Sequence, residues 1–189
     1  MMPFKRFFAS VIVFCVFSAL FLTDMYSVRA ASSVKADTER LTPQAQVEII
    51  KQAKARAERF INLFKNNSPP PVVKQFAQEE VDLQAVTMRA KCGTEEKDKL
   101  VGQLASVVES LSREVREQVK ECKIGNAKLT KEGKNFAVVE LRLGNQNGDS
   151  FSVLVEVSKS SRKIVEVSVS GILVVNLAVS KMKAAKKGK

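Results

Sequence analysis

The chain of 189 residues contains no histidine, no tryptophan and only three cysteines. Without histidine, it lacks the commonest general base and the commonest metal ligand of proteins. Ser-His-Asp and Cys-His catalytic sites are therefore excluded. Two cysteines, Cys92 and Cys122, lie outside the N-terminal apolar run, and two thiolates are too few for a closed zinc site, which takes four ligands. No motif indicates a carboxylate pair or a Ser-Lys dyad, so we expect no enzyme, no metal and no cofactor.

Only one long apolar run is present, and it lies at the N-terminus. Lys5 and Arg6 precede the run from Ala9 to Leu22, and Val28-Arg29-Ala30 closes the segment. A positive start, a short apolar middle and small residues before the cut are typical of a secretory signal peptide. The run has about 14 residues, whereas a membrane-spanning helix needs about 20. We expect cleavage after Ala30 and export of the protein; an uncleaved signal anchor is the alternative.

The charge of the chain is strongly positive, with 31 Lys and Arg against 20 Asp and Glu. Removing residues 1–30 leaves 28 basic and 19 acidic residues, a net charge of +9. The only dense basic run is the tail, Lys181 to Lys189. Such a run favours anionic partners, and export makes nucleic acid the poorer candidate. We expect the tail to bind an anionic membrane surface; a tail that only keeps the protein soluble is the alternative.

The first half of the exported chain has the apolar spacing of helices. Thr42-Pro43 suits an N-cap and a first helical residue, and the spacing predicts a helix over 43–65. Shorter helices are predicted over 72–78 and, after Asp82 as a cap, over 83–91. The longest is predicted from about Lys97 to Cys122. Such a helix would separate Cys92 from Cys122 by about 38 Å, too far for a disulfide, so we expect none.

After Gly125 the apolar period changes from 3.6 to 2. Alternation predicts strands over 137–143, 151–157 and 165–169, with an earlier one around 123–129. The apolar stretch 172–179 is either a further strand or a strand that runs into a final helix. We expect an α+β fold in which the N-terminal helices pack on one face of a C-terminal antiparallel sheet, with an apolar pocket between them. Residues 31–180 would form one domain, followed by the basic tail 181–189.

The stretch from Arg162 to Asn176 resembles the MlaC family of periplasmic phospholipid-binding proteins, the toluene-tolerance auxiliary component of an ABC transporter. That family has a strand of the form W-K-V-x-D-V-x-V-x-G-V-S-L-V. The chain has Arg162 in place of the tryptophan. Residues 57–61 fall in the family's first helix, and 81–93 resembles its D-x-x-x-I-A-x-x-x-L-G stretch. The matching residues of the strand are Lys163, Val165, Val167, Val169, Gly171, Ile172, Val174 and Val175.

This resemblance implies a periplasmic lipid carrier with a role in membrane lipid asymmetry. Such proteins hold the acyl chains of a phospholipid between helices and sheet, and shuttle it between an inner-membrane transporter and an outer-membrane partner. The expected partners are therefore phospholipid and membrane-bound transporter components. The residues expected to line the lipid site are Phe60, Phe64, Leu104, Val108, Leu111, Val139, Leu141, Val153, Val155, Val167 and Val169.

A second hypothesis is an exported adaptor domain that binds no lipid. Its sheet or long helix would dock on a membrane complex, and its core would be filled by its own side chains. The two hypotheses differ in physical terms, since burying about 30 methylenes of two acyl chains contributes roughly 24 kcal/mol. A lipid carrier would therefore still contain its lipid after purification, whereas an adaptor would be purified without lipid.

Overall fold

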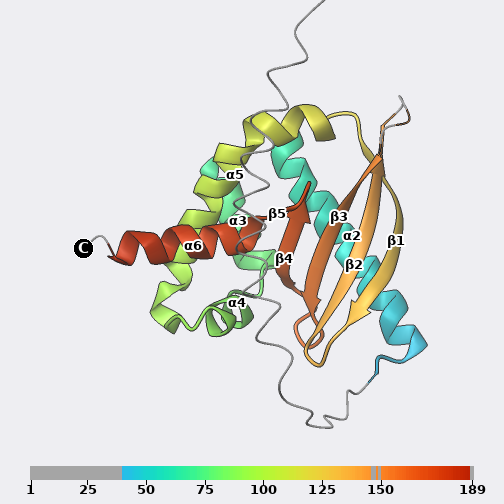
Figure 1. Ribbon diagram of the computed structural model, residues 1–189, viewed down its shortest axis with the longest axis horizontal. Coiled ribbons are helices and arrows are strands. Elements are labelled where there is room, and N and C mark those ends of the chain that lie inside the picture. The colour runs from blue at the N-terminus through green and yellow to red at the C-terminus, as the bar shows by residue number, and fades with distance from the viewer. Residues whose placement is uncertain (1–39, 146–147, 149, 188–189) are drawn as a thin grey trace, which may run out of the picture. The chain divides into compact units, whose positions relative to one another are not determined.

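The computed structural model describes residues 40–145, 148 and 150–187. The expected signal peptide, residues 1–30, lies outside them. The described chain has five α-helices and a five-stranded antiparallel sheet, with all strands in the C-terminal half (Figure 1). The expected α+β class is confirmed.

The helical half begins with α2 (Pro43–Lys65), which has the bounds expected from the sequence. The Thr42 hydroxyl accepts the Ala45 N–H at 3.3 Å and caps the helix. Asn67 ends it with a φ of 47°, a conformation that asparagine tolerates better than most residues. The helix α3 (Pro70–Glu80) follows and is longer at both ends than the predicted 72–78.

Two further helices complete this half. The Asp82 carboxylate accepts the Ala85 N–H at 2.9 Å, so Asp82 caps α4 (Leu83–Arg89) as expected. The helix expected to run to Cys122 and to be the longest is α5 (Lys97–Val119), which ends earlier and has 23 residues, as many as α2. A single 3₁₀ turn, η2 (Thr94–Glu96), precedes it. No disulfide joins Cys92 and Cys122, in agreement with the unbroken helix between them.

The sheet consists of β1 (Lys123–Glu132), β2 (Phe136–Gly144), β3 (Ser150–Ser158), β4 (Ile164–Val169) and β5 (Ile172–Leu173). The strands lie in chain order, each antiparallel to the next. Ser170 and Gly171 form the two-residue turn between β4 and β5, and both have positive φ. Glycine suits this turn because positive φ strains other residues.

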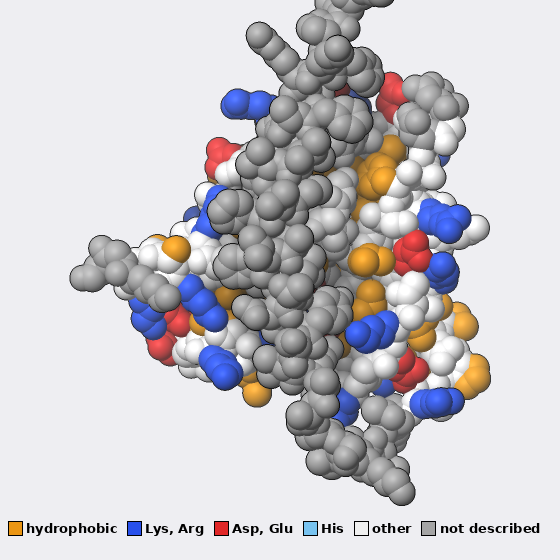
Figure 2. All heavy atoms as spheres, viewed as in Figure 1, with side chains coloured by type: hydrophobic (Ala, Val, Ile, Leu, Met, Phe, Trp, Pro, Cys, Tyr) orange, Lys and Arg blue, Asp and Glu red, His pale blue; other side chains and the backbone are white. Residues whose placement is uncertain are grey.

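The two faces of the sheet differ in their cover. Buried valine and leucine side chains of β2, β3 and β4 face α2, which lies behind the sheet in Figure 1 and contacts β1 to β4. The helix α5 packs against other helices, namely α2, α3 and α6 (Val174–Lys187). The opposite face of the sheet is turned to the viewer in Figure 2, where apolar side chains lie among charged ones. The main hydrophobic core is therefore between α2 and the sheet and continues into the helices.

The edges of the sheet also differ. Along β4, the backbone pairs with β5 at Ser168 and Val169, and Val81 forms a bridge with Ile164. At the other edge, β1 is mostly exposed, and its pairing with β2 shifts register between Ile124 and Ala127 and again near Leu129. These shifts bend β1, and it is the long edge strand of the sheet.

The apolar stretch 172–179 is a short strand that runs into a helix, which was the second of the two expected forms. The helix α6 begins directly after β5 and continues to Lys187, so most of the expected tail belongs to it. Met182 is buried with the core, whereas Lys181, Lys183 and Lys186 are exposed. The basic residues therefore lie on the solvent side of an amphipathic helix.

Candidate functional site

The residues expected to line a lipid site are brought together in one hydrophobic core. The six strand residues all face α2 and form two cross-strand rows. Val139, Val155 and Val167 make one row, and Leu141, Val153 and Val169 make the next.

The helical residues of this set meet the core from two helices. Phe60 and Phe64 lie on α2, and their rings meet edge to face with centroids 5.3 Å apart. Leu104 and Val108 lie on α5, which packs mainly against other helices, and Leu111 is only partly buried at the margin of the core.

The space between these residues is filled by protein side chains. All of them except Leu111 are at most 2% exposed. A hydrophobic ligand therefore enters this interior only if α2 and the sheet move apart.

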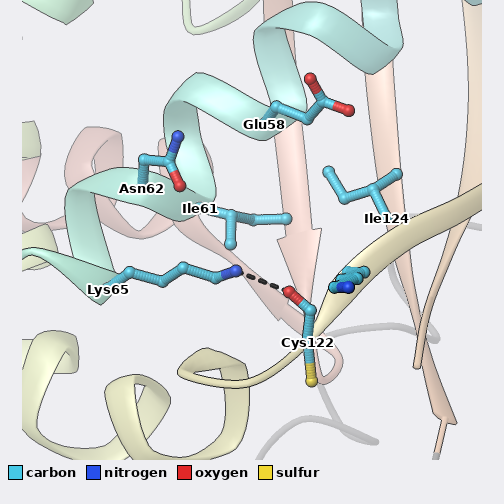
Figure 3. A pocket seen from close by; sticks show the side chains of 7 residues that line it. Glu58, Ile61, Asn62, Lys65, Cys122 and Ile124 are labelled. Atoms are coloured by element: carbon cyan, nitrogen blue, oxygen red, sulfur yellow. Dashed lines mark hydrogen bonds between the residues drawn. The ribbon is translucent and has the colours of Figure 1, made fainter. Parts of the chain in front are cut away.

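A pocket of about 320 Å³ lies at one margin of the core, between α2 and the start of β1 (Figure 3). Its volume is at the lower end of the range for ligand sites, about 300–1,000 Å³. Four of its lining residues come from α2. Ile61, Asn62 and Lys65 follow Glu58 by three, four and seven residues, which places all four on one helical face. The other three lie where α5 leads into β1. The lining residues are Glu58, Ile61, Asn62, Lys65, Cys122, Lys123 and Ile124.

The pocket has an apolar floor and a polar rim. Ile61 and Cys122 are at most 3% exposed and belong to the hydrophobic core, and Ile124 packs against it. The Lys65 Nζ donates a hydrogen bond of 2.5 Å to the Cys122 carbonyl oxygen, which links the end of α2 to the start of β1 (Figure 3). The floor of the pocket is thus continuous with the apolar interior.

The sequence analysis did not identify these polar residues. Glu58, Asn62 and Lys65 repeat at helical spacing beside the apolar stripe of the same helix, which is a usable signal for a shared face. Their proximity to Lys123 depends on the packing of α2 against β1. Helical spacing alone does not give that contact.

A second polar arrangement lies where α6 begins. One oxygen of the Glu166 carboxylate accepts the N–H groups of Val167 and Val175 at 2.9 and 2.8 Å, and the other accepts the Asn176 N–H at 2.8 Å. Burial raises the pKa of Glu166 to about 7, although three backbone donors favour its charged form. Glu166 therefore caps α6 from the neighbouring strand and titrates near neutral pH.

Glu156 on β3 lies directly opposite Glu166 on β4 in the sheet, and its carboxylate binds the Arg89 guanidinium. Arg89 of α4 donates two hydrogen bonds of 2.8 and 2.7 Å to the Glu156 carboxylate, and its guanidinium lies 4.4 Å from the centre of the Phe136 ring. The bidentate bond to Glu156 raises the pKa of Arg89. Arg89 thus balances two carboxylates on the outer face of the sheet.

Within residues 40–145, 148 and 150–187, no three His, Cys, Asp or Glu residues are grouped so that they could hold a metal ion. In the same ranges, no helix has the length and apolar character needed to cross a membrane.

The sequence matches no protein-family model, and a search of curated proteins gave no match.

Proposed function

We propose that this protein is a periplasmic phospholipid carrier of the MlaC type, which moves lipid between an inner-membrane ABC transporter and an outer-membrane partner. The resemblance over residues 162–176 is the first support. These residues span β4, the two-residue turn with Gly171, β5 and the start of α6. The chain also has helices on one face of an antiparallel sheet, which is the fold predicted by the apolar spacing and is compatible with acyl chains held between helices and sheet.

The observation that carries the proposal is the continuity between the pocket and the apolar interior. An acyl chain that enters the pocket past Lys65 and Lys123 meets Ile61, Cys122 and Ile124, and it reaches the core beyond them only when α2 and the sheet move apart. The polar rim stays at the surface, where a head group keeps its contact with water. This arrangement suits an amphiphile better than a wholly polar or wholly apolar ligand.

The energetics of transfer fit a carrier. Each buried methylene contributes about 0.8 kcal/mol, so a loaded lipid does not escape into water. Transfer to another apolar site has a small net free-energy change, because the chains are buried before and after. Lys186 of α6 forms an ion pair with Glu96 at 3.1 Å, and the exposed Lys181 and Lys183 add attraction to an anionic bilayer, about 1 kcal/mol for each lysine near the surface.

The proposal is tested by the lipid content of the exported protein. The protein is purified without detergent from cells, and organic extracts and native mass spectra are examined for phospholipid. We expect about one phospholipid per protein molecule and transfer of labelled lipid between vesicles. A protein that holds no lipid and transfers none would contradict the proposal.

The adaptor hypothesis is favoured by one specific observation, the burial of all the expected lining residues except Leu111. A core that is already filled does not need a ligand for its stability. Under this hypothesis, the purified protein contains no lipid and its melting temperature does not change with added phospholipid vesicles. Under the carrier hypothesis, lipid raises the melting temperature, because a ligand that binds only the folded state stabilises it.

A further inference from the structure

The rim of the pocket carries opposite charges at its two ends. Glu58 and Lys65 lie seven residues apart on α2, which corresponds to about 10 Å along the helix axis. Lys123 also lines the pocket, and it directly follows Cys122, whose carbonyl oxygen accepts the bond from Lys65. The lining therefore contains two lysines, both tied to the junction of α2 and β1, and one glutamate a turn or more away along α2. Figure 3 shows the Glu58 carboxylate well separated from the Lys65 ammonium group, with Asn62 between them on the helix.

This distribution is complementary to a head group with both charges. We propose that the pocket binds the zwitterionic head group of a phospholipid, with the phosphate at Lys65 and Lys123 and the amine at Glu58. The proposal rests on the carrier function and names the lipid class of the same site. The amide of Asn62 can donate to the phosphate or accept from the amine. The acyl chains would leave the head group across Ile61 and Ile124 toward the core.

A purely anionic head group fits this rim less well. Its phosphate would find the same two lysines, but Glu58 would have no cation to pair with and would repel it. Discrimination between the two lipid classes is therefore expected to depend on Glu58. Lys123, by contrast, contributes to both classes, because both contain a phosphate.

Binding of the phosphate is also coupled to opening of the pocket. In the structure, the Lys65 ammonium group is engaged by the Cys122 carbonyl oxygen. A phosphate is a stronger acceptor for this ammonium than a neutral carbonyl, because the bond is then formed between two charges. Lys65 would release the start of β1 when it binds the head group. The edge between α2 and β1 would then be free to separate and admit the acyl chains.

The test uses the full exported protein and vesicles that contain equal amounts of phosphatidylethanolamine and phosphatidylglycerol. Loaded lipid is extracted and quantified by mass spectrometry. We expect the wild type to prefer phosphatidylethanolamine, and Glu58→Gln to lower that preference about two- to fivefold, the range of an exposed ion pair. Lys123→Gln is expected to lower the loading of both lipids. Circular dichroism confirms that each variant is folded.

Matched controls separate the pocket from general charge effects. Glu109→Gln on α5 and Lys131→Gln on β1 change exposed residues outside the pocket and should leave the lipid ratio unchanged. Soluble glycerophosphoethanolamine, added as a competitor, should reduce loading only weakly, because it lacks acyl chains. Strong competition by this compound or by inorganic phosphate would show a site for soluble phosphates and overturn the lipid assignment.

The remaining outcomes distinguish the two proposals. If lipid is loaded without a preference, or if Glu58→Gln leaves the preference unchanged, the head-group assignment is wrong while the carrier function stands. If neither lipid is loaded by any form of the protein, the carrier function fails, and the head-group assignment fails with it.

Discussion

Replacing Glu166 with glutamine tests the contact between the sheet and the last helix. The carboxylate accepts three backbone N–H groups, two of them from the first turn of α6. Glutamine has nearly the same shape but no charge and only one acceptor oxygen. It can keep the bonds from Val167 and Val175, which share one oxygen, and it loses the bond from Asn176. Asn176 is exposed, so water replaces that bond at a cost of about 1 kcal/mol.

The effect on the free energy of unfolding depends on pH, and its sign follows from the pKa. Burial raises the pKa of Glu166 from 4.5 to about 7, and Glu156 opposite it adds to the rise. At pH values between these two pKa values, the folded protein binds more protons than the unfolded chain, so the free energy of unfolding falls as the pH rises. The full shift corresponds to about 3 kcal/mol, lost progressively between about pH 4.5 and pH 8.

The difference between wild type and Glu166→Gln should therefore depend on pH. At pH 5 Glu166 is protonated in the folded protein and, like glutamine, has one carbonyl acceptor, so the two proteins should differ by less than about 1 kcal/mol. At pH 8 it avoids the cost of ionisation and should be more stable by about 2 kcal/mol, the balance of the two effects. Urea unfolding at pH 5, 6, 7 and 8, with Glu109→Gln as an exposed control, measures the difference directly. A difference that stays constant over this range would refute the assigned role of burial.

Three further outcomes are expected. Val155→Lys places an unpaired charge in the core and should abolish folding or lipid loading. Ser152→Lys, on the opposite face of the same strand, should change the free energy of unfolding by less than about 0.5 kcal/mol. A Val155→Lys protein that folds and loads lipid normally would show that the strand face is misassigned. Neutralising Lys181 and Lys183 of α6 with glutamine, while Lys186 keeps its ion pair with Glu96, should weaken binding to anionic vesicles at low salt and leave the fold intact; equal binding of wild type to neutral and anionic vesicles would contradict this. Non-reducing mass analysis of the monomer should find no disulfide between Cys92 and Cys122; a loss of two hydrogens would mean that α5 is broken between them.

Much of the fold was predictable because local periodicity is strong in this chain. The helix over 43–65 and the strands β2 to β4 follow directly from apolar spacing of 3.6 and 2. The stretch 172–179 was ambiguous, since a nearly continuous apolar run has no clear period. The tight turn at Ser170-Gly171 allows only a short strand, and the apolar residues that follow are buried as one face of α6.

The candidate site was only partly predictable. The apolar lining follows from alternation on the strands, which also sets the face of each valine. The pocket does not, because Lys65 and Lys123 are far apart in sequence and meet only when α2 packs beside β1. Glu166 has the spacing of a solvent-facing strand residue. Its burial depends on the start of α6, eight residues later, whose N–H groups face it.

The two edges of the sheet are protected from pairing with a second molecule in different ways. Along β4 the backbone groups pair with β5 and with the segment before α4, so that edge offers little to another chain. The strand β1 exposes its other side, but its register shifts and its exposed lysines, Lys123, Lys128 and Lys131, oppose the addition of a strand from a second molecule. The irregular shape of β1 thus has two consequences. The bend beside Ile124 shapes the pocket, and it also disfavours the pairing of sheets from neighbouring molecules into fibrils.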